Sequence, residues 1–114
     1  MAIKIYHNPR CSKSRATLAL LQEQGITPEI IEYLKTPPSE AELDQILTML
    51  GKEPGDLMRR GEQEFKDHIQ GKTLSRAETI ALMVAYPKMI ERPVVVNSNK
   101  AAVGRPPESV LSIL

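Results

Sequence analysis

The first third of the chain changes from a short apolar run to a helical pattern and back again. Residues 3–6 are largely apolar and are followed by the turn-forming segment His7-Asn8-Pro9, which predicts a buried strand. From Ser12 the apolar positions recur at helical spacing until Gly25, with an expected inner face of Ala16, Leu18, Ala19, Leu20 and Leu21. Residues 29–33 predict a second strand. This strand-helix-strand order is a βαβ unit, and its two strands should be parallel.

The middle of the chain is predicted to be helical. Residues 39–42 match a capping box, with Ser39 as the N-cap residue and Glu42 three residues later. The helical pattern that follows ends at Gly51. Residues 75–78 repeat this device, and Pro87 ends the second helix. The segment between them, residues 53–73, is polar and broken by glycines, so we expect short helical turns and loop.

The last segment predicts a hairpin and a helix. Residues 94–96 are three valines typical of a strand, residues 97–100 are a turn, and residues 101–103 are the returning strand. Pro106-Pro107 should open a final helix with Val110, Leu111 and Leu114 on its inner face. The whole order, β-α-β, helices, β-β-α, predicts an α/β chain with a thioredoxin-like mixed sheet. We expect a single domain over residues 1–114, with a helical insert at about residues 39–87.

Composition and charge narrow the classes of function. The chain has 114 residues, and its net charge of +1 gives no general attraction for nucleic acid or an anionic membrane. No apolar run approaches the roughly 20 residues of a membrane span. The first residues lack the basic and then apolar pattern of a signal peptide, so a cytoplasmic location is expected.

The single cysteine, Cys11, follows the first predicted strand and precedes the first helix. One cysteine excludes an intrachain disulfide, so a resolving thiol must come from another molecule. At a helix start the sulfur would meet unpaired amide hydrogens and the positive end of the helix dipole, which favour a nucleophilic thiolate. The same amides can bind an oxyanion, so we expect an anionic electrophile. The positive neighbours in sequence are His7, Arg10, Lys13 and Arg15. An inert buried cysteine is the alternative, and these polar neighbours disfavour it.

The spacing around Cys11 argues against three other kinds of site. A redox dithiol needs C-x-x-C, but Ser14 stands at the second cysteine position. A low-molecular-weight phosphatase would need an arginine where Thr17 stands. Pro9 keeps His7 and Cys11 from sharing a helical face, and two ligands are too few for zinc, so no metal is expected.

Three arginines that are remote in sequence are candidate anion ligands. Arg92 and Arg105 each precede a proline, which holds their backbone extended, and Arg59 follows a predicted helical turn. In a thioredoxin-like fold the proline that opens the third strand faces the cysteine loop, often through a cis bond, which would bring Arg92 to the sulfur. A planar guanidinium suits a tetrahedral oxyanion. Taken singly, each arginine is an ordinary solvated surface charge. Together they would hold an arsenate-like or phosphate-like anion for attack.

Five stretches, at residues 5–15, 33–38, 57–59, 90–96 and 104–108, carry a resemblance to the glutaredoxin-coupled arsenate reductases over nearly the whole chain. The resemblance implies that Cys11 is the nucleophile and that His7 and Ser14 lower its pKa. It assigns anion binding to Arg59, Arg92 and Arg105. Arg10 and Arg15 of the cysteine loop are further candidate ligands, although Arg10 and Lys13 differ from the residues of the well-studied enzymes.

This resemblance implies a cytoplasmic oxidoreductase of arsenic detoxification with no bound cofactor. The Cys11 thiolate would attack arsenate and displace water, and glutathione would then attack the adduct. Arsenic would leave as arsenite, and glutaredoxin would clear the mixed disulfide on Cys11. The expected partners are arsenate or a similar oxyanion, glutathione and glutaredoxin, with no nucleic acid or membrane, and we expect a monomer.

Two other functions stay open at this point. RNA-polymerase-binding stress regulators are expected to share this fold, but their redox switch uses C-x-x-C, which Ser14 removes, and the arginines would have no role there. A monothiol, glutaredoxin-like transferase would use Cys11 without any arsenate chemistry.

Overall fold

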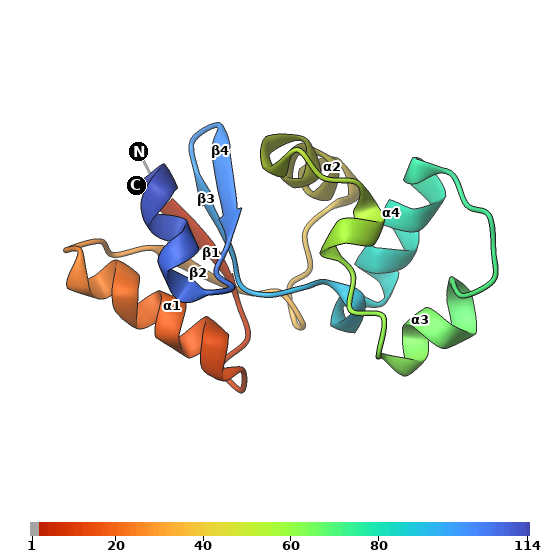
Figure 1. Cartoon of the computed structure of the whole chain (residues 1–114), viewed down its shortest axis with the longest axis horizontal. Coiled ribbons are helices and arrows are strands. Elements are labelled where there is room, and N and C mark those ends of the chain that lie inside the picture. Colours follow the sequence, from red (N-terminus) through yellow and green to blue (C-terminus); the bar gives the residue numbers. More distant parts are fainter. Residues whose placement is uncertain (1–2) are drawn as a thin grey trace. The chain divides into compact units, whose positions relative to one another are not determined.

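The computed structural model describes residues 3–114, and this part of the chain divides into two compact units. One unit joins the segment that ends at Thr36 to Arg92–Leu114 and contains the β-sheet (Figure 1). The other, Pro37–Glu91, is helical. Each unit is described by itself below.

The sheet has four strands in the order β2-β1-β3-β4 and is mixed, as predicted. β1 (Ile3–His7) runs parallel to β2 (Glu29–Glu32) and antiparallel to β3 (Val94–Asn97), and β3 forms a hairpin with β4 (Lys100–Val103). The βαβ unit and the C-terminal hairpin are thereby confirmed. β1 lies at the centre of the sheet, so its carboxyl end carries the chain from the core directly into the cysteine loop.

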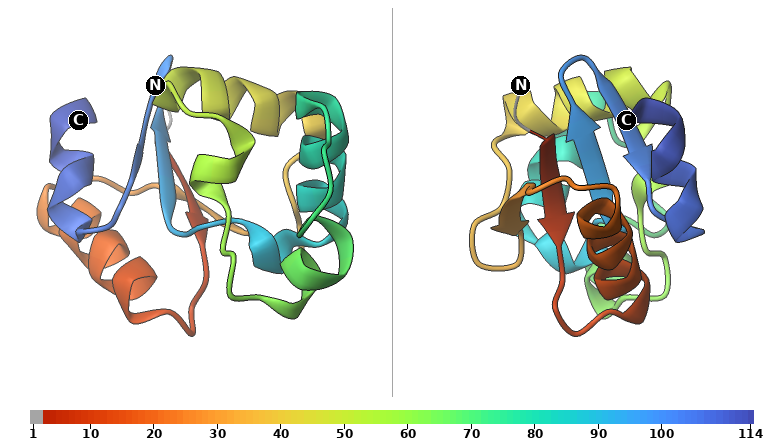
Figure 2. Two further views of the ribbon diagram at one scale, coloured as in Figure 1. Left: turned by 45° about the vertical axis from the view of Figure 1, so that its right-hand side comes forward. Right: turned by 90° about the vertical axis from the view of Figure 1, so that its left-hand side faces the viewer.

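One face of the sheet is covered by α1 (Ser12–Glu23) and the 3₁₀ helix η3 (Pro107–Ile113), as the right-hand view of Figure 2 shows. The core between them consists of Ile5, Leu21, Val95, Ala102 and Val110.

Two predicted helix faces were correct only in part. On α1, Leu21 lies in the core and Leu18 and Leu20 pack against it, as expected. On α1 the buried residues are Ser14, Thr17 and Leu21, whereas Ala16 and Ala19 are exposed. Positions 14, 17 and 21 are spaced by three and four, so they share one helical face, and the alanines fall outside it. The last helix is 3₁₀, in which residues three apart share a face. Val110 and Ile113 therefore face the core, while Leu111 and Leu114 are each 42% exposed.

The helical unit contains α2 (Glu40–Leu50), η1 (Pro54–Leu57), α3 (Gln63–His68), α4 (Arg76–Ala85) and η2 (Pro87–Met89). Both predicted capping boxes are present: the hydroxyls of Ser39 and Ser75 accept hydrogen bonds from the backbone N–H groups of Glu42 and Glu78. α2 ends at Gly51, whose φ of 66° lies in the left-handed region that glycine adopts without strain.

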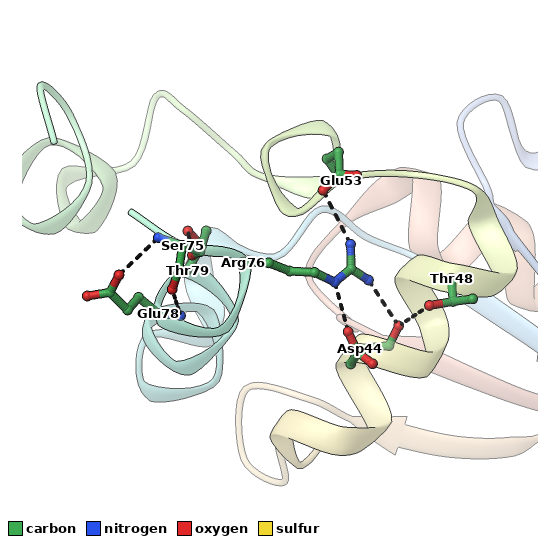
Figure 3. Close-up of polar contacts among 7 residues, drawn as sticks. All are labelled: Asp44, Thr48, Glu53, Ser75, Arg76, Glu78 and Thr79. Carbon is green, nitrogen blue, oxygen red and sulfur yellow. Dashed lines mark hydrogen bonds and ion pairs between the residues drawn. The ribbon is translucent and has the colours of Figure 1, made fainter. Parts of the chain in front are cut away.

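Arg76, the first residue of α4, ties this helix to α2 and to Glu53, the residue that precedes η1 (Figure 3). Its guanidinium donates to Asp44 Oδ1 at 2.8 Å and to Glu53 Oε2 at 3.3 Å. The α2–α4 contact is thus held by a charge pair at its rim as well as by buried apolar residues such as Leu47 and Met83. Among residues 3–114, no helix is long and apolar enough to cross a membrane.

Candidate active site

The loop between β1 and α1 is held by its own backbone and by Asn8. The N–H of Cys11 donates to the Asn8 carbonyl at 3.0 Å, and the N–H of Arg10 donates to Asn8 Oδ1 at 3.0 Å. Arg15 closes the loop from α1, because its Nη1 donates to the Pro9 carbonyl at 2.9 Å. Side-chain bonding by Asn to nearby backbone is typical of tight turns. The turn predicted at His7-Asn8-Pro9 is therefore present, and the Asn8 side chain helps to hold it.

Cys11 is the N-cap residue of α1, with extended backbone (φ −94°, ψ 123°), and its free thiol is partly exposed. The predicted position at the helix start is therefore correct. Burial alone would raise the pKa of the Cys11 thiol, but this is outweighed by hydrogen bonding from the backbone N–H groups of Ser14 and Lys13 and by the charge of Arg92. The net effect is a pKa below the ordinary value for cysteine, which increases the thiolate fraction at neutral pH.

His7 and Ser14 form a buried pair beneath the loop. His7 Nδ1 and Ser14 Oγ are hydrogen-bonded at 2.6 Å, and the N–H of Asn8 donates to the same hydroxyl at 3.0 Å. The hydroxyl of Ser14 thus contacts His7 and Asn8, and it is the backbone amide of Ser14 that lowers the pKa of Cys11.

His7 was expected to add positive charge near the sulfur, and its burial disfavours that charge. Burial lowers the pKa of His7 below its ordinary value, with the attraction of Glu32 opposing this shift and the repulsion of Arg15 adding to it. The shift favours the neutral imidazole, because a charged imidazole loses hydration when it is buried.

Two of the three remote arginines lie at the sulfur. Arg105 Nη1 is 4.0 Å from Cys11 Sγ and also donates to the Arg92 carbonyl at 3.0 Å, and the positive charge of Arg92 lowers the pKa of the thiol. Both arginines precede proline through a cis peptide bond. Residues 92 and 105 are thirteen positions apart, and the β3–β4 hairpin between them brings their backbones together at one end of the sheet.

The other candidate arginines have different surroundings. Arg10 is exposed, and Arg15 is exposed and bonded to Pro9 as described. Arg59 belongs to the helical unit, where its Nη1 donates to Glu62 Oε1 at 2.7 Å. Its part in the anion site stays a prediction. Across residues 3–114, no three His, Cys, Asp or Glu side chains are grouped so that they could hold a metal ion.

This geometry suits nucleophilic attack on an anion. The chain is also similar in sequence and in structure to several known proteins. A family model described as ArsC family matches residues 6–113. The chain is 49% identical to the uncharacterized protein YfgD of Escherichia coli over 98% of this chain and 96% of that one. It is 45% identical to an arsenate reductase of Haemophilus influenzae over the full length of both. A solved arsenate reductase from Vibrio cholerae superimposes with a TM-score of 0.94 at 50% identity, covering 100% of this chain and 98% of that one.

Proposed function

The chain belongs to the ArsC family, and we propose that it is an arsenate reductase whose nucleophile is Cys11. The observation that carries the proposal is the position of Cys11 at the start of α1 with the Arg105 guanidinium 4.0 Å from its sulfur. A thiolate next to backbone amides and guanidinium groups can attract a tetrahedral oxyanion and attack its central atom. The names of the full-length relatives from Haemophilus influenzae and Vibrio cholerae support arsenate as that oxyanion.

In the first step the Cys11 thiolate attacks arsenic(V), and an oxygen of arsenate leaves as water after protonation. Arg92 and Arg105 hold the remaining oxygens and stabilise the negative charge that gathers on them. Arg59 is the third proposed anion ligand, and Arg10 and Arg15 are candidates for weaker, longer-range attraction. Holding the anion beside the sulfur also reduces the entropic cost of bringing the two reactants together.

In the second step a thiol from another molecule attacks the sulfur of the arsenic adduct. The two sulfur atoms form a disulfide, and the electron pair of the S–As bond reduces arsenic(V) to arsenic(III), which leaves as arsenite. Glutathione is the proposed thiol, and glutaredoxin then reduces the mixed disulfide and returns Cys11 to the thiolate. External thiols fit this chain because its sequence contains one cysteine. A free thiol and a thiol reductant both suit a reducing compartment, so we propose that the reaction takes place in the cytoplasm.

The test is the formation of arsenite from arsenate by the purified protein. We expect turnover when glutathione and glutaredoxin are both supplied, and arsenite in no more than stoichiometric amount when glutaredoxin is omitted. Arsenate should also protect Cys11 from alkylation by iodoacetamide. If the protein turns over glutathione mixed disulfides but arsenate neither protects Cys11 nor is reduced, a monothiol transferase is the correct function and arsenate reductase is wrong.

A further inference from the structure

Gly104 lies where its neighbours leave no room for a side chain, and its backbone conformation does not require glycine. The described glycines with positive φ are Gly25, Gly51 and Gly71, so the backbone of Gly104 is one that any residue adopts. A Cβ atom at Gly104, however, would lie 2.8 Å from Cγ of Pro93 and 3.0 Å from Cγ2 of Thr17, and it would also collide with Thr17 Oγ1. A larger residue would therefore force one of these neighbours to move.

Thr17 and Pro93 have little freedom to move. Thr17 is fully buried, and its Oγ1 donates to the Lys13 carbonyl at 2.8 Å while lying 3.4 Å from the Gly104 carbonyl. Pro93 is buried as well, and its carbonyl accepts a hydrogen bond from the N–H of Gly104 at 2.9 Å. Close-packed interiors transmit such a displacement to their neighbours instead of absorbing it.

Each residue of this contact is connected to a residue of the candidate active site. Thr17 lies on α1, whose N-cap is Cys11, Pro93 follows Arg92, and Gly104 precedes Arg105. The three segments meet again at the sulfur, where Arg105 Nη1 reaches both the Arg92 carbonyl at 3.0 Å and Cys11 Sγ at 4.0 Å. The contact between Thr17 of α1 and Gly104 thus helps to set the distance from the guanidinium to the thiolate.

We propose that Gly104 and Thr17 are positioning residues, which hold Arg105 against Cys11 so that an oxyanion can bind to both. The proposal rests on the oxyanion site of the proposed function. It assigns no contact with the anion to either residue. Their effect passes through Arg105, and so a change at Gly104 should act only as long as Arg105 is present.

The experiment measures the concentration of arsenate, and separately of inorganic phosphate, that halves the rate of Cys11 alkylation by iodoacetamide. In Gly104→Ala this midpoint should rise roughly tenfold or more, because the added methyl group displaces the Arg105 segment. Gly25→Ala is the matched control: it strains a backbone at φ 78° in the same unit, but no atom lies within 4 Å of the added Cβ. It should lower the melting temperature and leave the midpoint unchanged.

Two further variants separate positioning from loss of stability. Adding Thr17→Ala removes both Thr17 atoms that crowd the new methyl group, so Thr17→Ala/Gly104→Ala should recover part of the lost affinity. It also serves as the test variant if Gly104→Ala does not fold. Gly104→Ala/Arg105→Ala should have the same midpoint as Arg105→Ala alone, because the residue being positioned is absent.

The outcomes distinguish the two proposals. If arsenate and phosphate fail to protect the wild-type protein, the oxyanion site itself is wrong. If they protect the wild type and Arg105→Ala weakens this protection, but Gly104→Ala behaves like the wild type, then only the positioning role is wrong. An additive loss in Gly104→Ala/Arg105→Ala would also contradict it, since it would show that Gly104 acts independently of Arg105.

Discussion

The two units of the molecule use arginine in opposite ways. In the helical unit, Arg76 forms salt bridges with Asp44 and Glu53. Arg59 forms one with Glu62, so both arginines are paired with carboxylates. In the sheet unit, Arg105 contacts the sulfur of Cys11 and the Arg92 carbonyl, and Arg92 lowers the pKa of the thiol. Arg76, held by carboxylates, ties α4 to α2, whereas an arginine directed at a thiolate can act on a substrate. The environment of an arginine, more than its presence, therefore distinguishes structural from chemical roles.

The largest expected effect comes from the nucleophile. Cys11→Ser should abolish arsenate reduction, because a serine hydroxyl is not ionised at neutral pH and cannot form the disulfide that reduces arsenic. Ser14→Ala should leave a reduced but measurable rate, since alanine keeps the backbone N–H that lowers the pKa of Cys11 and loses only the contacts with His7 and Asn8. Arsenite formation and the pH dependence of alkylation measure both. Equal loss in the two variants would show that the Ser14 hydroxyl has a direct catalytic role.

The arginines of the sheet unit should come next. Arg92→Ala and Arg105→Ala should each raise the midpoint of arsenate protection roughly ten- to hundredfold, because a charge-assisted hydrogen bond contributes about 1.5–3 kcal/mol. Lysine at either position keeps the charge without the planar fork and should restore the affinity only in part. Arg76→Ala is the matched control from the helical unit and should leave the midpoint unchanged.

Arg59 is the sharpest test of this difference between the two units. It lies in the helical unit and is paired with Glu62, yet the family resemblance assigns it to anion binding. We expect Arg59→Ala to weaken arsenate protection like Arg105→Ala, by roughly tenfold or more. Glu62→Gln should strengthen it slightly, since the guanidinium no longer has a competing carboxylate. If Arg59→Ala matches Arg76→Ala instead, Arg59 is a structural arginine and the anion site belongs to the sheet unit alone.

A smaller effect is expected from the helix caps of the helical unit. Ser75→Ala should lower the free energy of unfolding by about 1 kcal/mol, the usual cost of losing an N-cap side chain. At temperatures well below unfolding, arsenate protection of Cys11 should not change. Thermal unfolding and the alkylation midpoint, measured on the same preparation, test this separation of stability from chemistry. A large change of midpoint in Ser75→Ala would contradict it.

The smallest effect is a pH dependence from His7. Its pKa is lower in the folded state than the ordinary value near 6.5, so the unfolded chain binds the proton more readily. The stability that comes from keeping His7 neutral is complete above pH 6.5 and is lost as the pH falls through the folded pKa. Unfolding measured between pH 7.5 and pH 5, roughly the range in which histidine titrates, should show this decline in the wild type and less of it in His7→Gln. An identical decline in the two proteins would exclude His7 as its source.

Local signals in the sequence predicted much of the fold. The capping boxes at Ser39 and Ser75 and the stop at Gly51 each act within a few residues, and the structure confirms them. The position of Cys11 at the start of α1 is local in the same sense, because it follows from a strand, a turn and a helix in direct succession. The faces of α1 and of the last helix were harder to predict, because which side is buried depends on what packs against it.

Sequence alone thus determined the order of elements, the capped helices and a single thiol at a helix start, because each of these depends on neighbours in the chain. Only the tertiary structure decided that Arg105 meets Cys11, that burial lowers the pKa of His7 and that Thr17 and Gly104 lie in contact. Residues 17 and 104 are far apart along the chain, and neither carries a charge or a reactive group from which a role at the site could be predicted. Their importance comes from the space between three packed segments, which is a property of the folded chain and not of any stretch of its sequence.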